Sequence, residues 1–600
     1  MNRLPVADLL ANAVAAHRRG DLAAAEAGYR ELVAEDGRHF HALLGLGVIR
    51  MQGGRREEAA EFLRRAVDVD PNSADAHANL AQVLFQLNRT EPAGEVAARA
   101  IALDPDHANA HNVLGLVHLA EGRAAEARVA FTRAASLAPG FVDPHCNLAE
   151  AAGQEQRFDN ALRHARQAVS MAPSRFETQI ALGRALTRAR HFKEAIGVFE
   201  AMLRQCPKSP DALVGLGTAL VRAGHVETAI GLIEEALQSL PREYDLIVHL
   251  GDLLLARGDT AAALERYRQA EALHPDTAPA QTGLAMALAL QGDLRGAFAR
   301  FEWRLGAYGK NAFRVVPERR WQGEDIAGRT IVLYSEQGFG DTLQFVRYAP
   351  LVAERGARVV LEVPPALKDL FTGMAGVAEI VGTDQPLPGY DAQCPIMSLP
   401  AVFGTTLKTV PATVPYLNAP AARSAEWARA LGPLDRPRIG VVWAGNTRHT
   451  HDHYRSIPLE RMLPLFELSD ARFVTLQKEK RPRDAALLST RLEVLDLGAR
   501  LNSFADTAAA IAQLDLVIAV DTSVAHLAGA LGVPTWILLC LSPDWRWMDG
   551  GTDSPWYPTV RLFRQSRLGD WDSVVADVCA ALAGWLERYP GGQLRSVSGT

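Results

Sequence analysis

Proline recurs in the first half of this chain at a fixed spacing of 34 residues. The prolines of this series are Pro71, Pro105, Pro139, Pro173, Pro207, Pro241 and Pro275. A leucine column, Leu46 to Leu284, and an alanine column, Ala59 to Ala297, keep the same spacing. Small residues let paired helices approach, leucine fills the space between them, and proline ends the second helix of each unit. The spacing therefore predicts a stacked array of helix pairs.

These columns resemble the tetratricopeptide repeat, whose period is 34 residues. The resemblance covers about residues 4–309 and implies roughly nine units. Such arrays form a superhelix whose concave face usually holds a peptide or a protein. Three histidines share the spacing, namely His77, His111 and His145. We expect them to have a structural role at the helix packing face, with ligand binding as the alternative.

Composition limits the classes of function. The formal net charge is −6, whereas nucleic-acid binding requires a basic surface. No apolar run approaches the roughly 18 residues of a membrane span, and the N-terminus lacks the pattern of a secretory signal. The five cysteines are widely scattered, which fits neither a disulfide framework nor a zinc site. We therefore expect a cytoplasmic protein without a membrane span.

Beyond residue 309, helical periodicity gives way to alternating strands and helices. A predicted strand at Ile331–Tyr334 is followed by a glycine-rich turn with Gly338, Gly340 and Asp341, then by a helix that ends near residue 356 and a strand at Arg358–Val363. Open α/β sheets bind ligands at the carboxyl ends of their strands, which is where this turn lies. Asp341 either caps the helix or points into the ligand crevice.

Three later predicted strands, Ile439–Trp443, Arg472–Leu476 and Leu516–Val520, end in polar residues. These residues are Asn446, then Gln477 and Lys478, then Asp521, Thr522 and Ser523. The carboxyl ends of parallel strands share one edge of a sheet, so we expect these side chains to lie together. A lysine beside the start of a helix suits a bound phosphate.

Several side chains near this edge have two interpretations. His526 either fills the core or contacts a sugar or phosphate, and Arg455 either helps to cap the helix that begins near Pro458 or reaches a phosphate. The aromatic cluster of Trp545, Trp547, Trp556 and Tyr557 either stacks on a base or sugar or packs in the core. The alternating His449, His451 and His453 suggest a metal, but their loop setting, with only Asp452 as a carboxylate, disfavours it.

The ordered motifs of the second half resemble those of heptosyltransferase-related glycosyltransferases, which have two Rossmann-like domains in the GT-B fold. The motifs are GFGDTLQFVRYAP, WAGN, RSIPL, VDTSVAHLAGALGVPTW and SPWYPTVRLFRQ, within about residues 329–590. The chain is more closely similar to bacterial proteins that carry repeats ahead of this domain. That group includes flagellin glycosyltransferases that transfer nonulosonic acids such as pseudaminic acid.

The resemblance implies roles for individual residues. The acidic residue after the family's first glycine loop is its proposed catalytic base and corresponds to Asp341. The phosphate-binding lysine corresponds to Lys478, and Ser523 stands where heptosyltransferases usually have glycine. The donor-binding candidates, taken from the motifs and the strand ends together, are Gly338, Gly340, Trp443, Asn446, Arg455, Gln477, Lys478, Asp521, Thr522, Ser523 and His526.

We therefore expect a tetratricopeptide α-solenoid over 1–309, an acceptor-side Rossmann-like domain over 310–425 and a nucleotide-sugar domain over 426–600. Phe301, Trp303 and Trp321 are expected to form the seam between repeats and domain. The predicted activity is metal-independent transfer of a sugar, without a cofactor, from a nucleotide-sugar to Ser or Thr of a protein acceptor recruited by the repeats, with flagellin as one candidate. The alternatives are a glycan or lipopolysaccharide glycosyltransferase, a repeat-based adaptor or chaperone with an inactive transferase domain, and a nucleotide-sugar sensor.

Overall fold

The computed structural model describes residues 5–307, 317–432, 436–446, 452–468, 470–491 and 493–589. The chain forms two compact units that divide between His225 and Val226. The N-terminal unit contains most of the helical repeats. The C-terminal unit contains the remaining repeats, residues 226–306, together with the whole α/β region.

The N-terminal unit is a run of antiparallel helix pairs. Its helices are α1 (Val6–Arg18), α2 (Leu22–Glu35), α3 (Phe40–Gln52), α4 (Arg56–Val69), α5 (Ala74–Gln86), α6 (Thr90–Leu103), α7 (Ala108–Ala120), α8 (Ala124–Leu137), α9 (Asp143–Gln154), α10 (Phe158–Met171), α11 (Phe176–Arg188), α12 (Phe192–Gln205) and α13 (Pro210–Arg222). Gly183 and Gly215 pack on the ring of Phe199, where a Cβ atom would come within 2.5 and 2.3 Å of it. At these two positions a small residue is needed because an aromatic ring fills the space between the helices.

The repeated histidines take part in the packing of their own repeats. His77 is buried, and its Nδ1 lies 2.9 Å from the carbonyl oxygen of Ser73. The Nε2 of His111 lies 2.9 Å from the carbonyl oxygen of Pro105. These two rings each tie a helix to the turn before it. His145 makes no such bond through its Nδ1 among the described residues, and its ring stacks on that of His164 at 6.0 Å.

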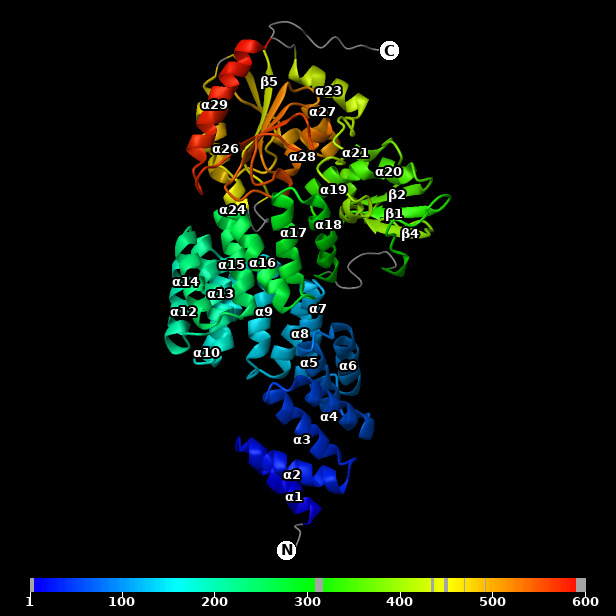
Figure 1. The fold of residues 1–600 in the computed structure, drawn as a ribbon, viewed down its shortest axis with the longest axis vertical. Coiled ribbons are helices and arrows are strands. Elements are labelled where there is room, and N and C mark those ends of the chain that lie inside the picture. The colour runs from blue at the N-terminus through cyan, green and yellow to red at the C-terminus, as the bar shows by residue number, and fades with distance from the viewer. Residues whose placement is uncertain are drawn as a thin grey trace. The chain divides into compact units, whose positions relative to one another are not determined.

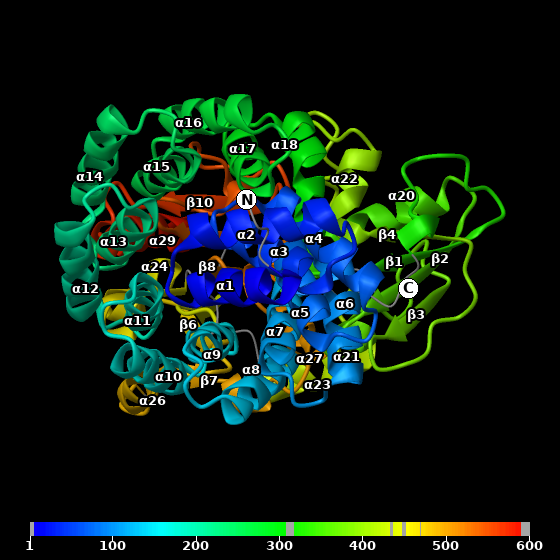
Figure 2. The same ribbon diagram turned by 90° about the horizontal axis from the view of Figure 1, so that it is seen from below.

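The C-terminal unit begins with further repeat helices. They are α14 (Val226–Ser239), α15 (Tyr244–Arg257), α16 (Thr260–Leu273), α17 (Ala278–Leu290) and the short α18 (Leu294–Phe301), which passes into the 3₁₀ turn η1 (Glu302–Ala307). Figure 2 shows α14 to α18 following one another side by side. Gly251 and Gly283 enclose the ring of Tyr267 in the way that the first unit encloses Phe199, so these pairs are built by the same rule.

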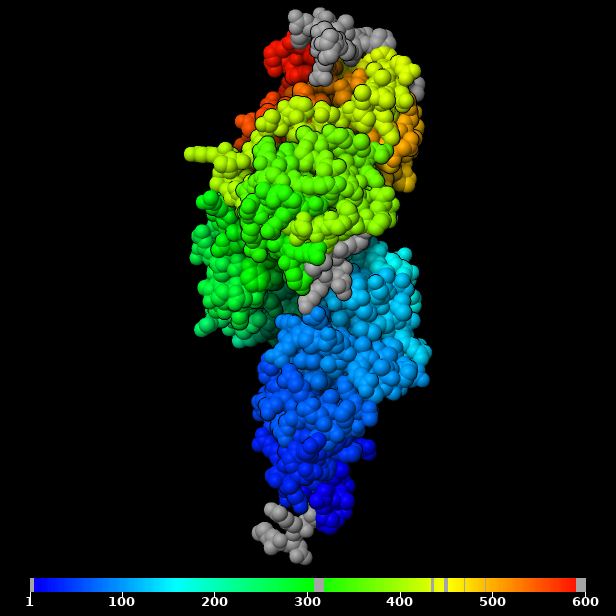
Figure 3. Space-filling model, turned by 90° about the vertical axis from the view of Figure 1, so that its right-hand side faces the viewer, coloured from blue at the N-terminus to red at the C-terminus, as the bar shows by residue number. Residues whose placement is uncertain are grey.

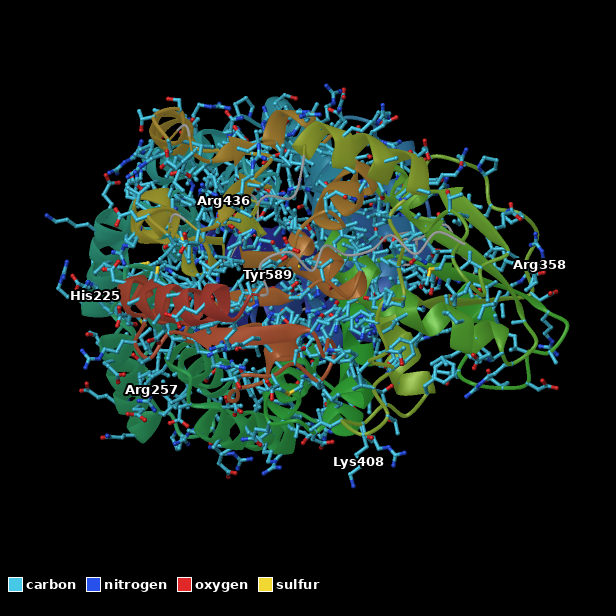
Figure 4. All side chains as sticks on the ribbon, turned by 90° about the horizontal axis from the view of Figure 1, so that it is seen from above. His225, Arg257, Arg358, Lys408, Arg436 and Tyr589 are labelled. Carbon is cyan, nitrogen blue, oxygen red and sulfur yellow. The ribbon has the colours of Figure 1, made fainter. Side chains whose placement is uncertain are left out.

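A small parallel sheet follows, with the strand order β3-β2-β1-β4. Its strands are β1 (Thr330–Tyr334), β2 (Arg358–Val363), β3 (Glu379–Gly382) and β4 (Ala392–Pro395). The two strands expected at 331–334 and 358–363 are confirmed, and Arg358 opens β2 at the outer end of this sheet (Figure 4). In Figure 3 the last repeat, in green, and the small sheet, in yellow-green, form a continuous surface.

The helix expected to run unbroken from the glycine turn to near residue 356 is interrupted. It consists of α19 (Phe339–Phe345), the 3₁₀ turn η3 (Val346–Tyr348) and α20 (Ala349–Ala353). Pro350 stands in the first turn of α20, where it cannot donate a backbone hydrogen bond to the preceding turn. The small sheet also carries α21 (Pro365–Phe371) and α22 (Leu399–Val402).

A larger sheet has the strand order β10-β9-β8-β5-β6-β7, and all its pairings are parallel. The strands are β5 (Arg438–Val442), β6 (Arg472–Thr475), β7 (Leu495–Asp496), β8 (Leu516–Val520), β9 (Thr535–Leu539) and β10 (Val560–Arg564). The helices are α23 (Ala421–Leu431), α24 (Asp452–Arg455), α25 (Leu459–Phe466), α26 (Pro482–Leu488), α27 (Phe504–Ile511), α28 (Ser523–Ala530) and α29 (Trp571–Arg588). In Figure 1, α29 and α26 lie on one side of this sheet and α23 and α27 on the other.

The second half of the chain is therefore an α/β region with two parallel sheets, as expected. No helix among the residues that the structure describes is both long and apolar enough to cross a membrane.

An aromatic seam joins the last repeat to both sheets of the α/β region. Phe298 of α18 contacts Phe345 of α19 and Trp545, which follows β9, at ring distances of 6.3 and 5.6 Å. Phe301 lies 5.2 Å from the same Trp545, and Trp556 closes the cluster 5.8 Å from Phe345. The last repeat therefore shares its core with the α/β region.

Two of the three residues expected at this seam lie elsewhere. Trp303 is 36% exposed, so it is not part of the buried seam. Trp321 is buried, but its ring contacts Phe403 within the region of the small sheet. Only Phe301 occupies the expected position, because the seam is built from the preceding helix α18.

Candidate functional site

The start of α28 carries a buried hydroxyl group that caps nothing. Thr522 is the N-cap residue, yet its side chain accepts no hydrogen bond from the first turn. The residue is 9% exposed, and among the described residues its Oγ1 has no hydrogen-bond partner. A threonine at this position ordinarily bonds to the N–H groups of its own helix. A buried polar atom left unsatisfied costs about 1–3 kcal/mol, so this arrangement favours a ligand that accepts hydrogen bonds.

The glycine turn packs directly on that helix start. Gly338 is the N-cap of α19, and its N–H donates to Oδ2 of Asp341 at 2.8 Å. A Cβ atom at Gly340 would come within 3.0 Å of the His526 ring and 3.8 Å of the Cα of Ser523. A side chain at this position would press on the His526 ring, and two motifs about 180 residues apart in the sequence meet at one place. Asp341 is a helix cap and also faces the second sheet.

The carboxylate of Asp341 is held from the other side by Arg546, which lies in the 3₁₀ turn η6 (Trp545–Trp547). Arg546 is buried and donates to Oδ1 of Asp341, to Oδ1 of Asp544 at 2.8 Å and to Oε1 of Gln344 at 2.5 Å. Burial opposes the charge of Arg546, but the carboxylates of Asp544 and Asp341 outweigh it and raise its pKa. The guanidinium therefore remains a cation between two carboxylates.

His526 belongs to the core. It is 4% exposed, its Nδ1 lies 2.9 Å from the hydroxyl of Tyr557, and its ring stacks on Trp547 at 5.2 Å. Burial, followed by the charge of Arg546, lowers its pKa to about 3. His526 is thus a neutral, hydrogen-bonded packing residue. The structure disfavours the expected donor contact of His526, because its ring already has these neighbours.

The aromatic cluster after β9 also packs in the core. Trp545, Trp547, Trp556 and Tyr557 are all at most 4% exposed. Their rings contact the last repeat and His526. The structure therefore favours core packing over stacking on a base or sugar.

Asp521 lies beside a second cation. Burial and the neighbouring Asp544 raise the pKa of Asp521 to about 6, while the charge of Arg455 opposes this rise. Arg455, at the end of α24, is 20% exposed and lies 3.6 Å from Oδ1 of Asp452. Its Nε has no hydrogen-bond partner among the described residues. A guanidinium donor and the hydroxyl of Thr522 are therefore both available to an anionic ligand.

Trp443 and Gln477 are framework residues. The ring of Trp443 is fully buried, and its Nε1 donates to Oδ2 of Asp484 at 3.0 Å. The amide of Gln477 accepts from the N–H of Trp443 and of Ala444, and it donates to the carbonyl of Ala444. These contacts fasten the end of β6 to the end of β5. They leave neither side chain free to contact a donor, contrary to the expectation for both residues.

The strand order brings the expected polar ends together. β5 lies between β8 and β6. Thr522 follows β8, Asn446 follows β5 and Lys478 follows β6, so Asn446 comes from the middle strand of the three. Asn446 and Lys478 are exposed. Two strand spacings amount to roughly 10 Å, so a ligand would have to span that distance to contact both Thr522 and Lys478. His449 and His451 lie outside the described residues.

The sequence did not single out Arg546, Asp544 or Gln344. The sequence did contain a signal for Arg546. This residue stands between two tryptophans of a cluster that packs in the core, and a buried charge needs a polar partner. The partner itself was not visible, since Asp341 lies 205 residues away in the chain.

Comparisons with known proteins identify the first half. Sequence profiles of the tetratricopeptide repeat match residues 10–74, 146–210, 180–244 and 248–308, residues 51–117 and residues 108–131. This half is therefore an array of tetratricopeptide repeats, a scaffold that generally mediates protein binding.

The chain is also similar to individual proteins. "Protein FlbA" of Caulobacter vibrioides (strain ATCC 19089 / CIP 103742 / CB 15) is 26% identical over 294 residues, which cover 44% of this chain and 48% of FlbA. This chain thus spans about half the length of that curated relative. The crystal structure of MamA is 26% identical with a TM-score of 0.24, covering 28% of this chain and 91% of MamA. The APC/C hetero-tetramer Cut9-Hcn1 is 17% identical with a TM-score of 0.37, covering 47% and 55%.

Proposed function

We propose that this protein is a glycosyltransferase that moves a sugar from a nucleotide-sugar donor to a Ser or Thr hydroxyl of a protein bound by the repeats. The observation that carries this proposal is the contact between the glycine turn and the start of α28. It places Asp341 beside a helix start whose buried threonine hydroxyl lacks a partner among the described residues. The two parallel sheets support a GT-B arrangement.

The start of α28 is suited to the donor phosphate. Free N–H groups of the first turn and the helix dipole favour an anion. The hydroxyl of Thr522 and the Nε of Arg455 add two further donors. Such fixed donors stabilise the negative charge that develops on a departing nucleotide phosphate. We expect no metal or cofactor to be required.

Asp341 is suited to the role of base. In the proposed step the acceptor oxygen forms a bond to the anomeric carbon while its proton passes to the carboxylate. The bond from that carbon to the phosphate oxygen breaks, and the phosphate leaves with the electron pair. Each carboxylate oxygen of Asp341 already accepts one hydrogen bond. Because an ionised carboxylate offers about four lone-pair positions, it can accept a further one from the acceptor hydroxyl.

The repeats supply the protein acceptor in this proposal. The resemblance to flagellin glycosyltransferases makes flagellin and a nonulosonic acid the first acceptor and sugar to test. A scaffold role with an inactive second half is the second candidate. The pairing of Asp341 with Arg546 favours that alternative, because one of its carboxylate oxygens is already engaged by a guanidinium.

A transfer assay with the full chain separates the two candidates. The protein is screened for thermal stabilisation by CMP-, UDP- and GDP-sugars, because a ligand of the folded state raises its stability. The stabilising donor is then assayed with purified flagellin. Asp341→Asn should lower kcat by about 100-fold or more, whereas Asp325→Asn, an exposed carboxylate of the same region, should not. Equal activity of the wild type and Asp341→Asn would refute the assignment of the base.

A further inference from the structure

The last repeat meets the glycine turn through one buried arginine. Arg304 lies in η1, directly after α18, and is 7% exposed. Its Nε and Nη2 donate to the two carboxylate oxygens of Glu336 at 3.1 and 2.5 Å. The side chain of Glu336 is fully buried, and this residue stands two positions before Gly338. A paired arginine fork therefore holds the segment that leads into the glycine turn.

The other donors of Arg304 fix its own position. Nη1 donates to the carbonyl of Phe301 at 2.9 Å and to Glu302 at 3.0 Å, and Nη2 donates to Oγ of Ser398 at 2.9 Å. Ser398 follows β4, whereas Glu336 follows β1. Arg304 thus joins the end of the repeat array to the carboxyl ends of two neighbouring strands. A lysine could not make this set of contacts, because it lacks the planar fork.

The same repeat also supports the far side of the turn. Phe301 packs on Trp545, and the guanidinium of Arg546 lies 4.4 Å above the ring of Trp545. Arg546 in turn holds Asp341. The segment 298–304 therefore reaches the glycine turn from both sides, through Glu336 and through the pair of Asp341 with Arg546.

We propose that Arg304 is a positioning residue through which the last repeat sets the geometry of the glycine turn, so that Asp341 is aligned for transfer only while that repeat is in place. This proposal rests on the transferase function proposed above. Displacement of a reacting group by about 1 Å costs roughly 100-fold in rate. The repeats are then a structural part of the reaction site as well as the place where the acceptor binds.

The test compares full-length Arg304→Lys with wild type. Donor affinity is measured by calorimetry, and kcat and the donor KM by transfer to the protein acceptor. We expect kcat to fall about 100-fold, with donor affinity and donor KM unchanged within about twofold, because the phosphate donors of α28 are not touched. The matched control is Arg300→Lys, since Arg300 of α18 pairs with Glu271 of the repeats at 3.3 Å. It should retain wild-type kcat.

Glu336→Gln provides a second variant that preserves shape should Arg304→Lys fold poorly. It should lower kcat in the same way, with thermal stability recorded alongside. Unchanged kcat in both variants would overturn the positioning role, as would a parallel loss of donor affinity and kcat. If the wild type transfers sugar and both variants equal it, only the positioning role fails. A wild type that binds no nucleotide-sugar removes the proposed function and this proposal with it.

Discussion

Asp341 and Arg546 form an ion pair across the two sheets of the α/β region, although 205 residues separate them in the chain. Asp341 belongs to α19 beside the small sheet, and Arg546 follows β9 of the large sheet. The position of Asp341 is therefore fixed only where these two parts are packed together. The guanidinium of Arg546 is shared between two carboxylates, because Asp544 also accepts a hydrogen bond from it.

Arg546→Met is expected to destabilise the C-terminal unit by about 3–5 kcal/mol, since it leaves two carboxylates facing each other without a cation. Urea unfolding measures the loss. Arg561→Met is the matched control. Arg561 stacks on Phe563 at 4.7 Å but is exposed, so its replacement should change stability little. Equal losses in the two variants would mean that the buried pair contributes no more than a surface contact.

Thr522→Val tests whether the hydroxyl at the start of α28 serves a ligand. The hydroxyl has no hydrogen-bond partner among the described residues, so its removal should leave the free energy of unfolding unchanged or slightly raised. Donor affinity should fall about tenfold, the value of one hydrogen bond to a charged group.

Thr507→Val is the control for this test. The hydroxyl of Thr507 donates to the carbonyl of Ser503 at 3.0 Å, so this variant should lose about 1 kcal/mol of stability and keep its donor affinity. The hydroxyl of Thr522 has only a structural role if Thr522→Val instead lowers stability without changing donor affinity.

The sequence predicted well what depends on local pattern. Apolar runs placed β8 and β2 to the residue, and the 34-residue period predicted the helix pairs, because each of these features is encoded within a short stretch. It also placed Thr522 correctly at the start of a helix. Trp443 shows the limit, since the same apolar character suits a ligand contact or a core position, and only the fold brings Asp484 to its indole nitrogen.

Contacts between distant segments were out of reach. Nothing near Arg304 in the sequence indicates Glu336 or Ser398, and the repeat pattern itself predicted that residues 226–306 would belong with the other repeats. The repeats extend to residue 308 as expected. The aromatic seam adds a contact that the pattern did not indicate, because Phe298 buries its ring against Phe345 and Trp545 of the α/β region.

Phe298→Ala is expected to destabilise the C-terminal unit by about 3–5 kcal/mol, the usual cost of deleting a buried phenyl ring. Hydrogen exchange should show faster exchange in α18, α19 and the segment around Trp545 together. Phe199→Ala removes an equally buried ring from the N-terminal unit, and its faster exchange should stay within α11 to α13. Faster exchange confined to the repeats in Phe298→Ala would contradict a shared core.

His526 gives the stability a pH dependence of defined sign. Its pKa is about 3 in the folded protein, owing to burial and then to Arg546, against an ordinary value of 6.5. Between these values the unfolded chain binds a proton that the folded protein does not. The stabilisation is therefore complete above pH 6.5 and is lost on acidification toward pH 3, by about 1.4 kcal/mol per pH unit.

His526→Gln removes this titration while its amide can still bond to the hydroxyl of Tyr557. Urea unfolding at pH 7, 6, 5 and 4.5 should give the variant a shallower decline toward acid than wild type. The raised pKa of Asp521 acts in the opposite direction, but it is present in both proteins and largely cancels in the difference. Parallel curves would contradict this prediction, because they would show that the folded protein binds a proton at His526 as readily as the unfolded chain does. Packing of the ring between Trp547 and Tyr557 should prevent that.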